Sequence, residues 1–356
     1  MSAGGASVHL HYMSPLTGGL FNRGFSMSGT ALNPWVLQEN PLEKAKKLAA
    51  ILECDTEDIR TMINCLSHMP ARIVAQAMEH FFGYLYNPFS PFGVVVEPRT
   101  APNAYLTQHP YELLRSGDIQ DLPWITSTVQ SEGLYPGAEF VSDAKYLSEI
   151  DSRWTELAQY ILDYNYTADC AQKSIVAEKV KEYYLKGDAI SRDTFDKLVQ
   201  LIGNRLFDAD AAMAAQLQAS TTTSDVYFYH FTYRGAHSKS EALSKCNENF
   251  GASHGDDAVY VLSSNINTTT TDLDIQMTDT LVDVWLSYAK NGIPLLNNKP
   301  WTGVSTTSGA PLNYVEIQSP SSYIEQSDAD FGNSAFWHSL PLQENQNLFP
   351  NVKEEL

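Results

Sequence analysis

The sequence predicts an α/β protein, in which strands alternate with helices along the chain. Runs rich in β-branched and aromatic residues at 122–129, 226–231 and 312–317 are typical of strands. Segments with apolar residues at helical spacing lie between them, at 153–164, 171–185 and 193–218. Strands separated by helical segments are the pattern of an α/β fold.

The composition describes a folded, strongly acidic protein. The 356 residues carry 23 basic and 42 acidic side chains, a formal net charge of −19. Such a surface repels phosphate, so we expect no nucleic-acid partner. Apolar residues make up 43% of the chain, enough for a sizeable core. No apolar run approaches the ~20 residues of a membrane span, and the first five residues lack the features of a signal peptide.

The first half of the chain offers a helix and a buried strand. A helix is expected from Pro41, because proline favours the first helical turn and apolar residues recur at helical spacing up to Leu52. The run 122–129 is continuous enough to be a buried strand, and it ends at the polar residues 130–133. A loop is therefore expected directly after this strand.

The second half continues the alternation. The aromatic run 226–231 is expected to be a strand. A long helix is expected over 275–291, with Asp274 as its N-cap and Gly292 at its end. The run 312–317 is expected to be the last strand, and the polar residues beyond Pro341 to be a loosely ordered tail.

Cysteines and glycosylation signals give weaker indications. Cys54 and Cys65 are close in sequence, whereas the other two cysteines stand alone. No Cys-x-x-Cys or His-x-x-x-His pair occurs, so we expect no metal site. Asn165 and Asn267 each begin an Asn-x-Thr triplet, which suggests a secreted glycoprotein. That suggestion conflicts with the absence of a signal peptide.

The first five residues, Met-Ser-Ala-Gly-Gly, contain half of a nucleophile-elbow motif. Ser2 is followed by the x-Gly half of Gly-x-Ser-x-Gly, and residues 6–13 suit the helix that must come next. The elbow needs small residues because the chain turns sharply from strand to helix around the serine. On this pattern alone, a flexible terminus is the commoner explanation.

A serine elbow predicts an acid and then a histidine later in the chain. Glu132 lies just after the strand predicted over 122–129, where the acid belongs. His254 follows in a loop of small residues, which leaves an imidazole accessible. The rivals are weaker, because His230 lies within a strand and His237 in a polar loop. The order selects Ser2, Glu132 and His254 as a set.

The chain resembles the C-terminal two thirds of a type-B carboxylesterase, the family that includes cholinesterases and insect esterases. The resemblance implies an α/β-hydrolase fold with an incomplete central sheet over residues 1–341, followed by a polar tail at 342–356. The matching stretches run almost from end to end: 2–8, 19–35, 94–98, 123–126, 131–136, 204–207, 227–229, 233–237, 251–257 and 336–337.

The resemblance also implies roles for single residues. Ser2 matches the nucleophile, Glu132 the triad acid and His254 the general base, and the backbone N–H of Ala3 matches one oxyanion donor. Trp35 and Phe92 match either acyl-pocket walls or ordinary core positions. Cys54 and Cys65 match a small-loop disulfide of the family. A small carboxylic ester is the implied substrate, and no cofactor is implied.

The resemblance leaves the beginning of the family's sequence unmatched. Met1 stands where the family has Glu, and the segment that supplies the other oxyanion donors is absent. A truncated gene model or an alternative start would explain this, so the 356-residue chain alone is expected to be inactive. The complete parent is expected to be secreted. The final Lys353–Leu356 resembles a Lys-Asp-Glu-Leu signal, which makes the ER lumen the alternative.

Two functional hypotheses follow. The first is a carboxylic ester hydrolase that acts through a covalent acyl-enzyme on Ser2. The second is a non-catalytic relative that binds partners or mediates adhesion. Such relatives usually lose the triad, which is complete here, so the sequence favours the enzyme.

Overall fold

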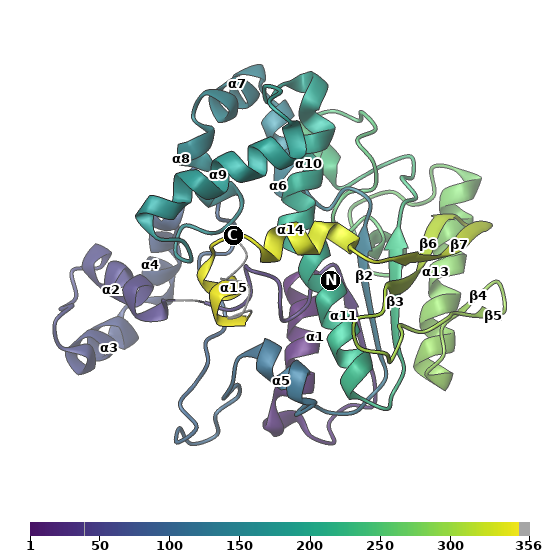
Figure 1. The fold of residues 1–356 in the computed structure, drawn as a ribbon, viewed down its shortest axis with the longest axis horizontal. Helices are drawn as coiled ribbons and strands as arrows, with labels where there is room; N and C mark the ends of the chain where they lie inside the picture. The colour runs from purple at the N-terminus through teal and green to yellow at the C-terminus, as the bar shows by residue number, and fades with distance from the viewer. Residues whose placement is uncertain (39, 349–356) are drawn as a thin grey trace.

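The computed structural model describes residues 1–38 and 40–348, and its centre is one five-stranded sheet (Figure 1). The spatial order is β1-β2-β3-β6-β7, and every neighbouring pair is parallel except β6 and β7. Helices cover the sheet, so the predicted α/β class is confirmed. The strands are β1 (Gly24–Met27), β2 (Trp124–Val129), β3 (Val226–Phe231), β6 (Leu312–Ser319) and β7 (Ser322–Asp328), with a separate hairpin of β4 (Leu295–Leu296) and β5 (Lys299–Pro300).

The two faces of the sheet bury different side chains because successive residues of a strand point to opposite sides. Trp124 belongs to the core shared with α1 (Ala3–Met13) and α11 (Ala209–Thr221), whereas Ile125 belongs to the core under α13 (Asp272–Asn291). Both faces are therefore covered, which explains why β2 is apolar along its length. Figure 1 shows α1 and α11 on one side of the sheet and α13 on the other.

A second layer of helices lies beyond the carboxyl ends of the strands (Figure 1). The Trp154 indole fixes two of these helices to each other, because its Nε1 donates to the Ala177 carbonyl at 2.7 Å. The helices of this layer are α6 (Leu134–Gly137), α7 (Ala144–Ser152), α8 (Trp154–Ile161), α9 (Cys170–Leu185) and α10 (Phe195–Gly203).

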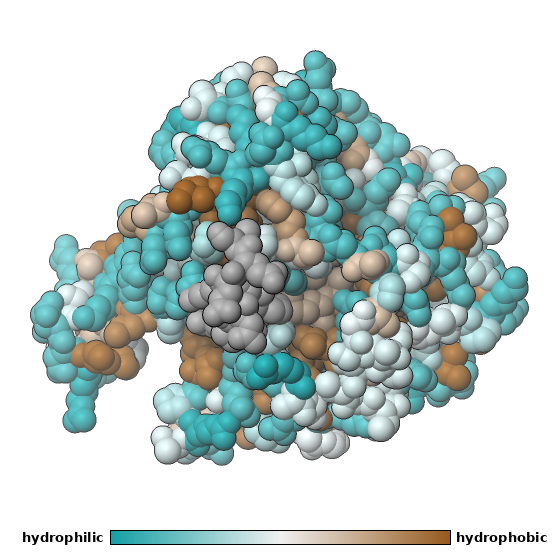
Figure 2. Space-filling model, in the orientation of Figure 1, coloured by the Kyte–Doolittle hydropathy of each residue, from teal (hydrophilic) through white to brown (hydrophobic). Residues whose placement is uncertain are grey.

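A small lobe projects from the body of the molecule (Figure 1). It contains α2 (Pro41–Ile51), α3 (Ile59–His68) and α4 (Ala71–Gln76). A disulfide joins Cys54 to Cys65 inside it, so the implied pairing is confirmed. Figure 2 shows a mostly hydrophilic surface with separate hydrophobic areas on this lobe. The remaining helices are α5 (Pro110–Ser116), α12 (Ser240–Ser244), α14 (Ser334–His338) and α15 (Gln343–Leu348).

Three elements differ from the sequence-based expectation. The long helix α13 starts earlier, because Thr271 caps it and Asp274 completes the capping box from inside. The hairpin strand β7 follows the strand that was expected to be the last. The expected loose tail begins with the helix α15, whose Glu344 forms an ion pair with Arg205 at 2.7 Å. The Lys353–Leu356 signal lies outside the described residues. Within the described part of the chain, no helix has the length and hydrophobicity of a membrane span.

Candidate active site

Ser2 occupies a strained turn at the start of α1. Its φ of 55° and ψ of −127° lie in a region of backbone conformation that residues other than glycine rarely adopt. Its N–H donates to the Met27 carbonyl at 2.8 Å, and its carbonyl accepts from the Ala6 N–H at 3.0 Å. These bonds hold the serine beside the carboxyl end of β1. Strain of this kind accumulates at functional sites, where the surrounding structure maintains it.

Two glycines allow this turn to pack closely against the chain after β1. A Cβ added at Gly29 would lie 2.2 Å from the Ser2 carbonyl oxygen, and one at Gly5 would lie 2.9 Å from the Met27 oxygen. Both distances are shorter than real Cβ contacts, so a side chain at either position would force the neighbouring backbone to shift. The small residues of the Ser-Ala-Gly-Gly stretch are thus explained in part by backbone packing.

Glu132 and His254 form a buried, directly bonded pair. The Nδ1 of His254 lies 2.6 Å from Oε2 of Glu132. Since a carboxylate can only accept, Nδ1 carries the proton and Nε2 is left with its lone pair free. The second carboxylate oxygen, Oε1, accepts from the Val129 N–H at 2.9 Å. The exposed fractions are 1% for Glu132 and 5% for His254, so water competes little for this bond.

The loops that carry this pair are joined by backbone. Glu132 is the third residue after β2, and the preceding Ser131 pairs with Ser253, the residue before His254. The Ser131 N–H donates to the Ala252 carbonyl at 2.9 Å. This contact fixes the acid and the histidine relative to each other before their side chains meet.

Aromatic rings hold the imidazole from two directions. The Tyr135 ring stacks against it at a centroid distance of 5.3 Å, and the Phe207 ring lies 4.5 Å away. The Nε2 of His254 is buried and has no hydrogen-bond partner among the described residues. A buried imidazole that is oriented through one nitrogen and free at the other is arranged to accept a proton.

Ser2 and His254 lie in adjacent segments. The side chain of Met1 packs against Gly255, since a Cβ there would lie 3.1 Å from the methionine Cε. The Ser2 hydroxyl makes no hydrogen bond to any described residue. The structure therefore joins Glu132 to His254 directly and brings the serine turn to the histidine loop.

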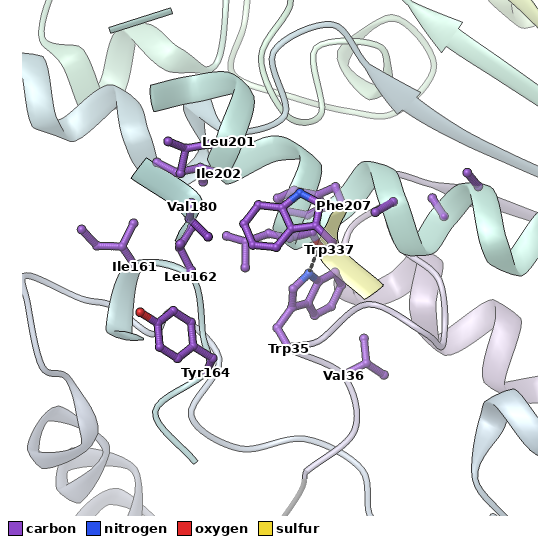
Figure 3. Close-up of a cluster of buried hydrophobic side chains, with 14 of the residues drawn as sticks. Trp35, Val36, Ile161, Leu162, Tyr164, Val180, Leu201, Ile202, Phe207 and Trp337 are labelled. Carbon is purple, nitrogen blue, oxygen red and sulfur yellow. Dashed lines mark hydrogen bonds between the residues drawn. The ribbon is translucent and has the colours of Figure 1, made fainter. Parts of the chain in front are cut away.

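The two candidate acyl-pocket aromatics lie in different surroundings. Trp35 is buried, and Figure 3 shows it facing Phe207 within a cluster of apolar side chains. Its Nε1 donates to the Leu206 carbonyl at 2.8 Å. Phe92 is 39% exposed and contacts Phe81 instead. Trp35 thus reaches the histidine through Phe207, and Phe92 has no ring contact with this cluster in the described chain.

A second acid lies near the pair. The Tyr229 hydroxyl donates to the buried Asp257 carboxylate at 2.7 Å. Burial raises the pKa of Asp257 to about 6, and the negative charge of Glu132 adds to this shift. In the described residues, no group of three or more His, Cys, Asp or Glu side chains is placed to hold a metal ion.

The two glycosylation signals differ in accessibility. Asn267 is exposed, and its side-chain oxygen accepts from the Thr269 N–H at 2.9 Å. Asn165 is half-buried, and its Oδ1 is enclosed without a partner among the described residues. The surroundings of Asn267 are therefore the more open to a glycan.

Sequence reasoning missed three aromatic residues that surround the histidine. Tyr135 and Phe207 contact its ring, and Phe89 lies behind both, at centroid distances of 5.1 and 6.4 Å. Tyr135 and Phe207 lie in stretches that carried the family resemblance, so position in such a stretch was a usable signal. Phe89 lies in a loop without periodicity, where no signal was present.

Comparisons with known proteins place the chain among insect esterases in sequence. Venom carboxylesterase-6 of Apis mellifera is 41% identical over 347 residues, which cover 97% of this chain and 62% of that protein. A carboxylic ester hydrolase of Bombus ignitus is 38% identical, with 97% and 61% covered. The chain thus spans about three fifths of the length of these relatives.

A solved structure and a family model extend the comparison. The crystal structure of juvenile hormone esterase from Manduca sexta, with OTFP covalently attached, matches 99% of this chain and 64% of its own. Its TM-score is 0.73 at 20% identity, which shows the shared α/β-hydrolase fold. The model of the carboxylesterase family matches residues 1–333. This chain therefore belongs to the carboxylesterase family.

Proposed function

We propose that Ser2, His254 and Glu132 supply, in that order, the nucleophile, the base and the acid of a serine carboxylic ester hydrolase. The observation that carries the proposal is the buried Glu132–His254 pair, bonded through Nδ1 and with Nε2 free. Ser2, in its strained turn beside the histidine loop, is the proposed nucleophile. Membership of the carboxylesterase family and the esterase names of the relatives support the same reaction class.

The proposed reaction proceeds in two halves. The Nε2 of His254 takes the proton of the Ser2 hydroxyl, and the serine oxygen attacks the ester carbonyl carbon. The tetrahedral intermediate collapses, the alcohol leaves with the proton from Nε2, and an acyl-enzyme remains. A water molecule then repeats the sequence and releases the acid. Throughout, Glu132 orients the imidazole and stabilises its charged form.

The substrate carbonyl and acyl group need their own contacts. The Ala3 N–H, at the start of α1, is the proposed oxyanion donor, and a helix N-terminus favours the negative charge that develops there. Trp35 is proposed to wall the acyl side, because it is buried next to Phe207. Phe92 stays a prediction, since its ring contact is with Phe81.

The proposal is tested by Ser2→Ala in the full-length protein. The parent should hydrolyse p-nitrophenyl and naphthyl esters and react covalently with a fluorophosphonate probe, and the variant should do neither. A matched control is Ser7→Ala, whose exposed hydroxyl only bonds back to the Ala3 carbonyl at 2.7 Å. An inactive, unlabelled parent would favour the alternative of a non-catalytic binding or adhesion relative.

A separate expectation concerns the activity of the 356-residue chain when it is expressed by itself. Loss of a single oxyanion donor lowers turnover by about 10²–10³, and within the described residues only the Ala3 N–H is assigned to this role. We expect this chain, expressed by itself, to be inert towards the same esters. Robust Ser2-dependent hydrolysis by the 356-residue chain would contradict this expectation.

Secretion and glycosylation form part of the proposal for the parent protein. The exposed position of Asn267 and the presence of a disulfide both favour an oxidising, extracellular compartment. A glycan is proposed at Asn267, and a glycan at Asn165 stays a prediction. The ER lumen is the alternative location.

A further inference from the structure

Asp208 lies beside the proposed catalytic acid and has no part in the reaction described above. It is 8% exposed, and its Oδ1 is buried without a hydrogen-bond partner in the described chain. Its side chain is close to Glu132, because a Cβ added at Gly203 would lie 3.4 Å from Glu132 Cβ and 3.5 Å from Asp208 Oδ2. Both acids therefore border the space that a side chain at position 203 would occupy.

The chain is built to bring these acids together. A Cβ at Gly133 would lie 1.9 Å from the Val199 carbonyl oxygen and 2.7 Å from the Gly203 nitrogen. A Cβ at Gly332 would lie 2.8 Å from Asp208 Cβ. These close approaches fix the backbone segments that carry Glu132 and Asp208 against their neighbours.

Asp208 is the last residue of a π-helical turn that also contains Phe207, whose ring contacts His254. The turn spans Asn204–Asp208, between α10 and α11. Such turns insert one extra residue into a helix and are frequent at functional sites. Here the turn aims two consecutive side chains at the pair: Phe207 contacts the ring of His254, and Asp208 borders Glu132.

The turn is held by side chains from the loop after β1. The Leu206 carbonyl accepts from Trp35 Nε1 and from Asn33 Nδ2, at 2.8 and 3.1 Å. The Phe207 carbonyl accepts from the same Asn33 Nδ2 at 3.0 Å. These bonds satisfy carbonyls that a regular helix would use internally, so the widened turn is stabilised from outside.

A polar cavity of about 260 Å³ lies behind Glu132, on the side where Asp208 stands. Asp328, Asp330 and His230 line it together with the two acids. The lining contains no Lys or Arg, so no cation there offsets the charge of Glu132. The Thr128 hydroxyl bonds to Asp208 and lies 3.0 Å from Nδ1 of His230. Burial lowers the pKa of His230 to about 4, so this neighbour is neutral at physiological pH.

We propose that Asp208 is a positioning residue of the active site: as a neutral carboxylic acid, it closes the back of Glu132 and keeps that carboxylate directed at His254. This inference rests on the function proposed above. An ionised Asp208 would leave a buried anionic oxygen without a donor, next to a second anion and with no cation in the cavity lining, which is costly. A neutral acid fills the same space without that charge. Burial and the charge of Glu132 both raise the pKa of Asp208 well above its usual value, in agreement with the geometry.

The test compares Asp208→Asn with Asp208→Ala in the full-length protein. Asparagine copies the shape of a neutral acid and keeps an N–H donor, so most of the wild-type kcat should remain. Alanine leaves Glu132 without its support, and misplacement of reacting groups by 1 Å can lower rates by about 10²-fold. We expect kcat and the rate of fluorophosphonate labelling of Ser2 to fall by roughly 10- to 10²-fold in the alanine variant, with KM nearly unchanged. Asp210→Asn is the matched control, because Asp210 pairs with His338 instead.

A stability measurement tests the protonation state independently of activity. If the pKa of Asp208 is higher in the folded protein than in the unfolded chain, the stability of the wild type falls as the pH rises from the unfolded-state pKa to the folded-state pKa. The asparagine introduced by Asp208→Asn cannot ionise, so the melting temperature of this variant relative to wild type should increase as the pH rises above about 4, the ordinary pKa of an aspartate.

Each result bears on one claim. An alanine variant with wild-type kcat and labelling rate would overturn the positioning role. An asparagine variant as impaired as the alanine variant, or a flat difference in melting temperature with pH, would overturn the neutral state. A wild-type protein that neither hydrolyses esters nor reacts with the probe refutes the proposed function, while the melting series still decides the state of Asp208.

Discussion

Replacing Gly29 with alanine should displace the proposed nucleophile without touching a catalytic side chain. Gly29 is buried in the chain after β1, and its Cα faces the Ser2 carbonyl. The new Cβ would lie 2.2 Å from that oxygen, 2.9 Å from the Ser2 carbonyl carbon and 3.2 Å from the Ala6 nitrogen. All three atoms are backbone, so no side chain can rotate away.

The magnitude follows from the distance. An ordinary contact requires about 3.5 Å, so the Ser2 turn must retreat by roughly 1 Å. Overpacking of this kind costs about 1–3 kcal/mol of stability. A shift of 1 Å at a reacting group can lower turnover by about 10²-fold. We therefore expect Gly29→Ala to lose most of its kcat while keeping a cooperative melting transition.

The assay compares Gly29→Ala with Gly18→Ala in the full-length protein. Gly18 is exposed and has a φ of −55° that alanine adopts freely, and its added Cβ would meet only the Pro15 oxygen at 3.7 Å. Ester hydrolysis and melting temperature should be unchanged in this control. A Gly29→Ala variant with wild-type kcat would refute the argument that this glycine maintains the Ser2 turn.

Two further predictions concern stability. Replacing Cys54 and Cys65 together with serine should lower stability by about 2–3 kcal/mol, the loop-entropy value for a short bridge, and leave kcat intact because the bridge lies in the α2–α3 lobe. Thermal melting and ester hydrolysis measure both effects, and a large loss of kcat would contradict them. For Asp257, burial raises the pKa from 3.8 to about 6, so the folded protein holds this proton more tightly than the unfolded chain. Wild type therefore loses stability as the pH rises through that window, and Asp257→Asn should gain relative to it up to about pH 6 and no further. Equal differences in melting temperature at about pH 4 and pH 7 would argue against the shift.

The spacing of apolar residues was sufficient to predict the helices and strands that bury a regular face. The strand expected over 122–129 forms as Trp124–Val129, and the aromatic run 226–231 forms β3 with the same limits. Both lie in the middle of the sheet, where β-branched and aromatic side chains pack on two faces. The strand β1 was missed because its four residues, Gly24–Met27, are too few for an alternating pattern to emerge.

The same approach could not find the π-helical turn. Residues 193–218 were expected to be helical throughout, and they are largely so. The extra residue in the turn Asn204–Asp208 changes which side chains point at the sheet ends, and no 3.6-residue pattern reports it. Periodicity therefore gave no reason to select Phe207 or Asp208 as site residues, and only the family resemblance of the stretch 204–207 pointed to Phe207. The carbonyls that stabilise the turn depend on Asn33 and Trp35, which stand 173 and 171 residues earlier in the chain than Leu206.

The order serine, acid, histidine could be used as a predictor because it reflects the order of strands. Ser2 is hydrogen-bonded to the last residue of β1, Glu132 follows β2, and His254 follows β3. These three strands are neighbours in a parallel sheet, so their carboxyl ends open on the same edge. In sheets of this kind, ligands bind outside the carboxyl ends of the strands. The order of Glu132 and His254 along the chain is therefore enough to predict that they lie close together, without any knowledge of side-chain contacts. The contacts that refine the pair, from Phe207 and Asp208, come from a helix that crosses the same edge, and strand order contains no information about them.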